Sequence, residues 1–187
     1  MDPGKKWTSG NSPSYWAEWE GSQLRDREFL AVYGPLTFQA EYTANVIHGV
    51  RRSATPTTPA GPPQGTIFYQ GCYVETMCFL TGESRTWNTK NFFFNRVIPL
   101  RPFKFRHDAC DGYGCGAWEI AARYTYIDAS NKAIQAGRID SVTLGLNWYM
   151  NPNSKLQFNY DYTNVGDKST TSQGHVSAFG IRSQFDF

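Results

Sequence analysis

The sequence has 187 residues, a formal net charge of +2 and an aromatic content of 16%. The near-neutral charge predicts no nucleic acid or other polyanion as a partner, because such ligands are bound by strongly basic surfaces. No stretch approaches the roughly 18 consecutive apolar residues of a membrane helix. Membrane β-strands alternate in polarity and escape such a search, so a membrane protein built of strands is not excluded.

The N-terminal residues 1–25 are predicted to be irregular. Residues 1–21 are rich in Gly, Ser, Pro and Trp and show no sustained period. No apolar stretch follows the charged residues Lys5 and Lys6, so we expect no secretory signal in this sequence. An exported protein needs one, so we expect either a reading frame that begins late or a piece of a longer chain.

The first predicted strands lie between residues 28 and 81. Glu28–Tyr33 is predicted as a strand that ends at the turn-forming pair Gly34 and Pro35. The following strand alternates, and its apolar face consists of Leu36, Phe38, Ala40, Tyr42, Ala44 and Val46. Arg51–Gly65 contains four prolines and is predicted as a loop. Thr66–Thr81 is a further β-rich segment.

Clear alternation returns in the last third of the chain. It predicts strands over Ala117–Asp128, Ser141–Met150, Lys155–Thr163 and Val176–Phe187. A polar loop over Ala129–Arg138, a tight turn over Asn151–Ser154 and a loop over Gly166–Gly174 separate them. In all, about seven strands of roughly ten residues are predicted, the length that crosses a membrane when tilted. We therefore predict an all-β fold, an antiparallel transmembrane β-barrel.

Two other all-β folds are alternatives to this interpretation. One is a small non-transporting barrel of about eight strands, with an extra strand near Tyr15–Glu20. The other is a soluble carbohydrate-binding β-sandwich, although sandwich strands are typically about five or six residues long.

The last strand ends on an aromatic residue. Phe185 and Phe187 lie on its apolar face, and the pattern resembles the closing strand of bacterial outer-membrane barrels. The resemblance implies that these two residues form an assembly signal recognised by the barrel-assembly machinery.

Several motifs occur in the order of one known family. Gly114–Asp128, Leu144–Asn153 and Leu156–Tyr162 resemble the C-terminal part of the phosphate-selective porins O and P. Tyr33–Tyr42 and Phe79–Glu83 resemble the upstream strand motifs of that family. The resemblance implies a barrel of the outer-membrane porin type, with about 16 strands when complete. Residues 26–187 would then form about the last seven strands of an incomplete barrel.

The resemblance also implies a function. Such porins are usually homotrimers in the lipid of the bacterial outer membrane and pass inorganic anions, phosphate or polyphosphate, by diffusion. We therefore expect a fragment of an anion-conducting porin, with no enzymatic step and no cofactor. The lumenal arginines of the family lie mainly in strands that this sequence does not contain, so none of them is assigned to a position here.

The long connection over Gly82–Cys115 is rich in basic residues. Strand parity places it at the periplasmic end, where short turns are usual. We expect it to fold toward the lumen and to add positive potential to an anion path. The candidate path consists of Arg96, Arg101, Lys104, Arg106, Arg123, Lys155 and Arg182. Alternatively, Asn91–Ile98 is a further membrane strand, which would reverse the parity of the strands before it.

The cysteines and histidines give weaker signals. Cys110 and Cys115 flank a turn-rich segment and are a candidate disulfide, whereas Cys72 and Cys78 are too far apart along one strand to bridge each other. A four-cysteine zinc site is a weaker alternative. Asp108 and Asp111 lie near His107, but a solvated loop explains them better than a metal site. The sequence shows no nucleophile or carboxylate pair at catalytic spacing.

Overall fold

The computed structural model describes residues 17–18, 21–52, 61–62, 65–90, 93–104, 114–130, 135–166 and 173–186. Every regular element within these ranges is a β-strand. The same ranges contain no helix that is long and apolar enough to cross a membrane.

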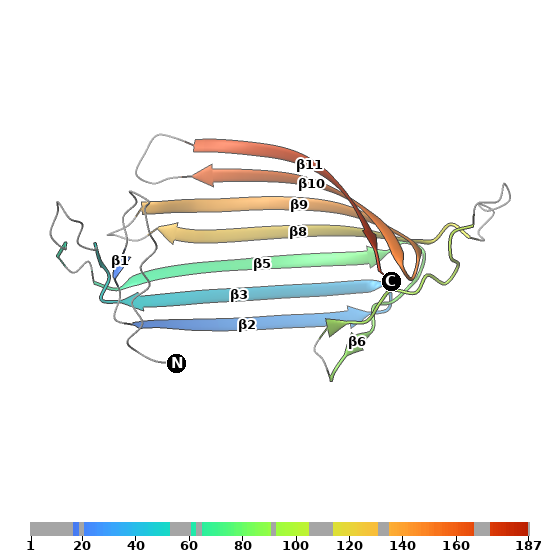
Figure 1. Cartoon of the computed structure of the whole chain (residues 1–187), viewed down its shortest axis with the longest axis horizontal. Coiled ribbons are helices and arrows are strands. Elements are labelled where there is room, and N and C mark those ends of the chain that lie inside the picture. Colours follow the sequence, from blue (N-terminus) through green and yellow to red (C-terminus); the bar gives the residue numbers. More distant parts are fainter. Residues whose placement is uncertain are drawn as a thin grey trace.

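Seven long strands form one antiparallel sheet in the order β11-β10-β9-β8-β5-β3-β2 (Figure 1). They are β2 Gly21–Tyr33, β3 Leu36–His48, β5 Ile67–Phe79, β8 Ala117–Ser130, β9 Gln135–Asn151, β10 Ser154–Gly166 and β11 Gln173–Phe185. Two small sheets lie apart from it, one made of β1 Ala17–Glu18 and β4 Arg51–Arg52, the other of β6 Trp87–Asn88 and β7 Phe93–Phe94. The predicted number of long strands is therefore confirmed.

The seven-stranded sheet does not close on itself in the described part of the chain. β2 and β11 are its two edges, and each has one neighbour in the sheet. The short strand β1 lies where the small-barrel alternative needed an extra strand, but it pairs with β4 rather than with an edge of the large sheet. The described strands therefore do not support a small closed barrel.

The observed strands are longer than the predicted ones. β2 begins at Gly21, well before the predicted Glu28, and β9 begins at Gln135, inside the predicted loop Ala129–Arg138. In both places charged side chains interrupt the apolar alternation, while the backbone ladder to the neighbouring strands continues without them. The sheet extends beyond its apolar part, so polarity alone cannot mark its ends.

The two ends of the sheet differ in the length of their connections. The turns at residues 34–35 and 152–153 lie at one end, which we call the short-turn end, and Gly34 has the positive φ of 56° that its tight turn needs. The connection over residues 80–116 joins β5 to β8 at this same end. The alternative strand over Asn91–Ile98 is not observed, because its described residues contribute only the two-residue strand β7 to a pair with β6.

The two faces of the sheet carry different side chains. One face, which we call the outer face, exposes large apolar residues such as Ile120, Tyr124 and Leu144. The opposite face, which we call the inner face, carries polar residues on alternating positions, including the buried Thr37 and Glu119. The predicted alternation is therefore confirmed over β3, β8, β9 and β10.

The outer apolar band has a defined limit on β8 and β9. It runs on β8 from Trp118, which stacks on Trp148 of β9, to Tyr124. The six residue-to-residue steps from Trp118 to Tyr124 span about 20 Å. Beyond this row, Asp140 accepts a hydrogen bond from the Tyr124 hydroxyl at 2.7 Å and pairs with Arg138 at 2.9 Å. The outer face thus turns polar toward the end opposite the short turns.

Candidate functional site

The 80–116 connection packs against the inner face of the sheet. Its Val97 forms a buried apolar cluster with Phe79, Ala117 and Tyr149, which lie on β5, β8 and β9. Its start is fixed by the buried Glu83, which accepts hydrogen bonds from Thr81 and from the backbone nitrogen of Leu100 at 3.0 Å. The described part of the connection is therefore an ordered segment seated on the strands.

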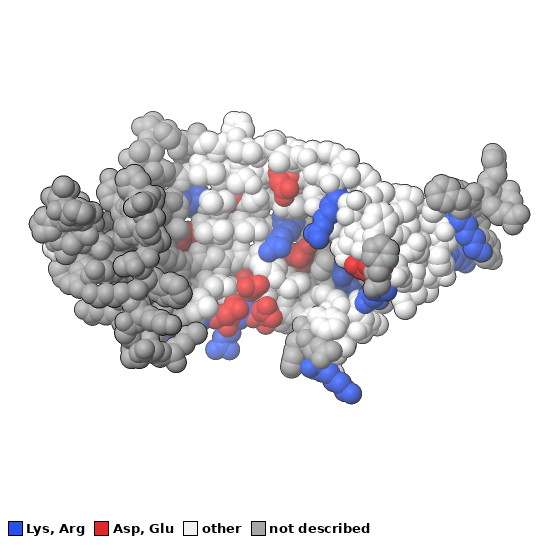
Figure 2. Space-filling model, viewed as in Figure 1, with Lys and Arg blue, Asp and Glu red and all other residues white. Residues whose placement is uncertain are grey.

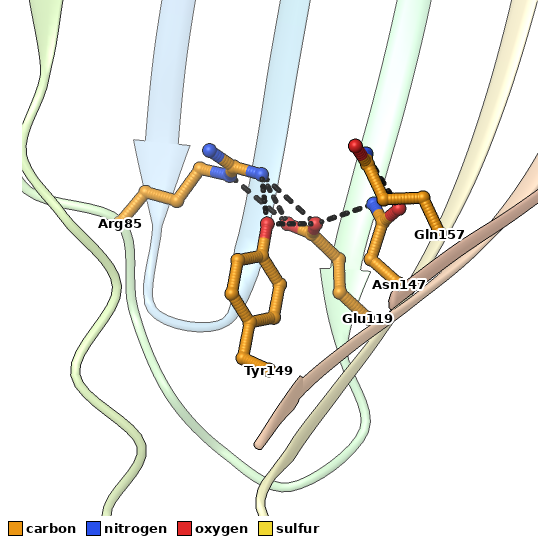
Figure 3. A network of polar contacts seen from close by, with 5 residues as sticks. All are labelled: Arg85, Glu119, Asn147, Tyr149 and Gln157. Carbon is orange, nitrogen blue, oxygen red and sulfur yellow. Dashed lines mark hydrogen bonds and ion pairs between the residues drawn. The ribbon is translucent and has the colours of Figure 1, made fainter. Parts of the chain in front are cut away.

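A polar network ties the connection to three neighbouring strands (Figure 3). Arg85 donates from Nε and Nη2 to the carboxylate of Glu119 on β8, at 2.9 and 2.8 Å. Tyr149 and Asn147 of β9 donate to the same carboxylate, at 3.0 and 2.9 Å. Gln157 of β10 donates to the side-chain oxygen of Asn147 at 3.0 Å. Glu119 is therefore fully satisfied despite having no exposed surface.

Two aromatic rings lie beside the guanidinium of Arg85, in addition to its polar partners Glu119 and Tyr149. Its guanidinium carbon lies 5.8 Å from the ring centre of Phe79 and 5.2 Å from that of Phe94. Burial alone lowers the pKa of an arginine, but attraction to Tyr149 and Glu119 and the hydrogen bonds to them outweigh it and raise the pKa of Arg85. Arg85 is therefore a permanent cation whose charge is compensated by Glu119.

A cavity of about 240 Å³ lies beside this network at the short-turn end. Arg96 of the connection and Lys155 of β10 both line it, and so does Asp186 after β11. The ammonium of Lys155 lies 5.6 Å from the ring centre of Tyr149. The structure thus brings together two of the predicted basic residues that are far apart in the sequence.

Two further predicted residues share the inner face. Arg182 of β11 lies opposite Gln157 of β10, one diagonal step from Lys155. Arg123 of β8 stacks on the ring of Tyr73 at 3.8 Å, and its buried Nε has no hydrogen-bond partner within the described ranges. Arg123 therefore adds a positive charge to the inner face, but its buried Nε is not exposed to a passing ion.

Two of the remaining predicted basic residues, Arg101 and Lys104, do not line this cavity. Arg101 and Lys104 are exposed, and Phe103 between them packs on Trp148, a residue of the outer face. The backbone nitrogen of Phe103 also donates to the carbonyl of Met150 at 2.7 Å. This part of the connection therefore follows the rim of the sheet. Arg106 lies outside the described residues.

The inner face carries acidic residues as well. Asp26 and Glu28 of β2 and Glu41 of β3 form a cluster whose carboxylate oxygens lie within 4.8 Å of one another. Figure 2 likewise shows acidic and basic side chains interspersed over the strands rather than one basic surface. The cluster was not predicted from the sequence, because the strand Gly21–Tyr33 that carries two of its members was recognised only in part.

The other predicted site residues lie only partly within the described ranges. Phe185 is paired with Ser154 and exposed on the outer face, while Phe187 lies outside the described residues. Cys115 accepts a hydrogen bond from the indole of Trp148 at 2.8 Å through its backbone carbonyl, and Cys110 lies outside the described residues. The predicted disulfide therefore stays a prediction, as do the roles of His107, Asp108 and Asp111. Cys72 and Cys78 carry free thiols.

The pair of Arg85 and Glu119 was not predicted from the sequence. The alternation predicted for Ala117–Asp128 puts Glu119 on the polar face, but its partner lies 34 positions earlier in a segment without periodicity. A charged residue flanked by Trp118 and Ile120 in a membrane strand was the available signal, since a buried carboxylate needs a cation or several donors.

Long antiparallel strands with an apolar outer face and a polar inner face define a transmembrane β-barrel wall of the outer-membrane porin type. The comparison with family models agrees, because the model of the phosphate-selective porins O and P matches residues 19–187. The chain belongs to this family, as its motifs indicated.

Two relatives extend the comparison. Porin O of Pseudomonas aeruginosa is 24% identical over 198 aligned residues, which cover 100% of this chain and 40% of that protein. An uncharacterised protein of Caulobacter vibrioides is 26% identical over 157 residues, covering 80% of this chain and 29% of that protein. The chain thus spans well under half the length of these two relatives.

Proposed function

We propose that this chain forms part of the wall of a porin in the bacterial outer membrane, through which anions such as phosphate or polyphosphate pass by diffusion. The observation that carries the proposal is the meeting of Arg96 and Lys155 at one cavity of the inner face, with Arg182 beside Lys155. Basic side chains that line a passage favour anions over cations. Passage by diffusion needs no chemical step, so we propose a channel and not an enzyme.

The outer face supports the location in a membrane. The soluble-sandwich alternative needs a second sheet to cover large apolar side chains such as Ile120 and Leu144, which are 45% and 51% exposed. Lipid is the partner that fits this band, and the short-turn end is then periplasmic. We further propose that Phe185 and Phe187 form a signal recognised by the barrel-assembly machinery. The complete porin is proposed to be a homotrimer, as the family resemblance implies.

The experiment measures ion selectivity of the native, fully assembled protein in a planar bilayer. Arg96, Lys155 and Arg182 are replaced together by Gln, and the reversal potential is recorded across a salt gradient. We expect the potential to shift away from the anion equilibrium potential, because three positive charges leave the inner face.

Arg138 provides the matched control. It is also a basic residue of a long strand, but it pairs with Asp140 on the outer face. Arg138→Gln is expected to leave the reversal potential unchanged. A triple variant with the selectivity of the unmodified protein would contradict the proposed anion path.

A further inference from the structure

We propose that Arg85 is a positioning residue whose ion pair with Glu119 holds the 80–116 connection across the passage and so sets its width. The inference rests on the proposed function, because a width matters only where ions pass. It assigns to Arg85 a role different from that of the other basic residues, since Arg85 acts on the connection and not on an anion.

The contacts of Arg85 leave little of its charge for a passing anion. Its side chain is 14% exposed, and that of Glu119 is 0% exposed. Its Nη2 donates to the carboxylate of Glu119 and also to the hydroxyl of Tyr149, the second at 3.1 Å. Arg96 lines the same cavity but is exposed, with no ion pair within the described ranges. Arg85 and Arg96 therefore differ: Arg85 is buried and ion-paired, whereas Arg96 is exposed at the cavity.

The wall side of the ion pair is rigid. Glu119, Asn147 and Gln157 are directly opposite one another on β8, β9 and β10, and hydrogen bonds link all three side chains. The Glu119 carboxylate is held by side chains of three hydrogen-bonded strands, so it can move only if the sheet itself changes. Arg85 is thus held by a fixed part of the wall.

The segment after Arg85 reaches another part of the wall. Trp87 packs edge-on against Phe94 at 5.1 Å within the β6–β7 pair. Trp87 also lines a second cavity, of about 430 Å³, together with Leu30 and Val32 of β2. Arg85 contacts β8 and β9, whereas Trp87 faces β2, and β5 and β3 separate β8 from β2 in the sheet. The connection therefore bridges strands that are not neighbours, which places it over the inner face, the side along which the proposed path of anions runs.

Loss of Arg85 is expected to release the β6–β7 pair without detaching the connection. The contacts of Glu83 with Thr81 and Leu100 do not involve Arg85 and keep the start of the connection in place. The released segment no longer stays at a fixed distance from the wall. The passage then becomes wider on average and fluctuates.

The experiment compares variants of the native assembled protein in planar bilayers. Arg85→Met removes the charge at similar length, and Arg85→Met combined with Glu119→Gln avoids leaving a lone buried carboxylate. Lys90→Met is the control, because Lys90 is an exposed cation of the same connection. We expect both Arg85 variants to raise single-channel conductance roughly two-fold or more and to increase current noise, because conduction follows pore diameter.

The conservative variant Arg85→Lys keeps a cation near Glu119 and is expected to restore most of the quiet, low-conductance state, while Lys90→Met leaves conductance unchanged. Unchanged conductance in both Arg85 variants overturns the proposal. Lower anion selectivity without higher conductance also overturns it, since Arg85 would then act on the anion.

Limited proteolysis separates this inference from the proposed function. The connection of Arg85→Met is expected to be cleaved faster than that of Lys90→Met, whether or not the protein conducts ions. If the connection of Arg85→Met is cleaved faster in a protein that forms no channel, the positioning role of Arg85 is supported and the proposed function is contradicted. Equal cleavage of the two variants contradicts the positioning role of Arg85.

Discussion

Gly116 approaches the carbonyl oxygen of Tyr149 so closely that a β-carbon at position 116 would lie 2.5 Å from it. The same β-carbon would lie 2.8 Å from the indole nitrogen of Trp148, and Gly116 has a φ of +74°. This contact fixes the end of the 80–116 connection to β9 at the point where β8 begins.

Gly116→Ala is therefore expected to destabilise the fold by roughly 2–4 kcal/mol, because a positive φ and a backbone clash act together. Urea unfolding of the lipid-embedded protein measures the loss. Gly82→Ala is the matched control, since Gly82 has a φ of +90° with no atom within 4 Å of its β-carbon position. It carries the backbone strain alone, and an equal loss in both variants would show that the contact with Tyr149 contributes nothing.

Trp148 of β9 contacts both β8 and the 80–116 connection, through three interactions. Its ring stacks on Trp118 at 5.2 Å, receives the edge of Phe103 at 5.1 Å, and its nitrogen donates to the Cys115 carbonyl. Trp148→Phe keeps a ring and loses the hydrogen bond, so we expect a loss of about 1 kcal/mol. Trp148→Ala also removes the ring contacts and is expected to cost several times more. Equal unfolding midpoints for the two variants would assign the whole effect to the hydrogen bond.

The predicted disulfide is testable by thiol labelling. Cys110 and Cys115 are expected to be bridged in an oxidising compartment, whereas Cys72 and Cys78 carry free thiols. Alkylation of the unfolded protein without reduction, followed by mass spectrometry, is expected to label Cys72 and Cys78 alone. Label on Cys110 before reduction would exclude the bridge. Reduction before alkylation is the control, and it is expected to label all four residues.

The sequence predicted those parts of the fold that depend on a repeated pattern. Alternation identified β3, β8, β9 and β10, because each strand meets apolar and polar surroundings on opposite faces. It failed where the surroundings change along the strand. Arg25 and Arg27 of β2 and Arg138 of β9 lie beyond the apolar band, so their strands continue without the pattern that marks them.

The sequence indicated basic residues that belong to the candidate site, but not how they are arranged. Arg96 and Lys155 were recognised as basic residues on suitable elements, but their meeting at one cavity depends on how the connection folds back. The connection has no period, and its position follows from single contacts such as Arg85 with Glu119 and Glu83 with Leu100. Contacts between residues far apart in the sequence leave no local pattern, which is why the sequence placed Arg101 and Lys104 with Arg96 although they follow the rim.

The two faces of the sheet predict opposite responses to an added charge. Leu144 is 51% exposed at the middle of the outer apolar band, so Leu144→Arg places a cation in lipid and is expected to cost about 2–4 kcal/mol. Asn159 of β10 is on the inner face opposite Gly145 and Gly180, which place no side chain beside it, so Asn159→Arg is expected to be tolerated. Heat-modifiable mobility of outer-membrane extracts on a denaturing gel measures assembly of each variant. Leu144→Arg is expected to reduce the assembled fraction strongly, and Asn159→Arg to leave it near that of the unmodified protein. Equal assembly of the two variants would mean that the outer face does not contact lipid, which would contradict the membrane location.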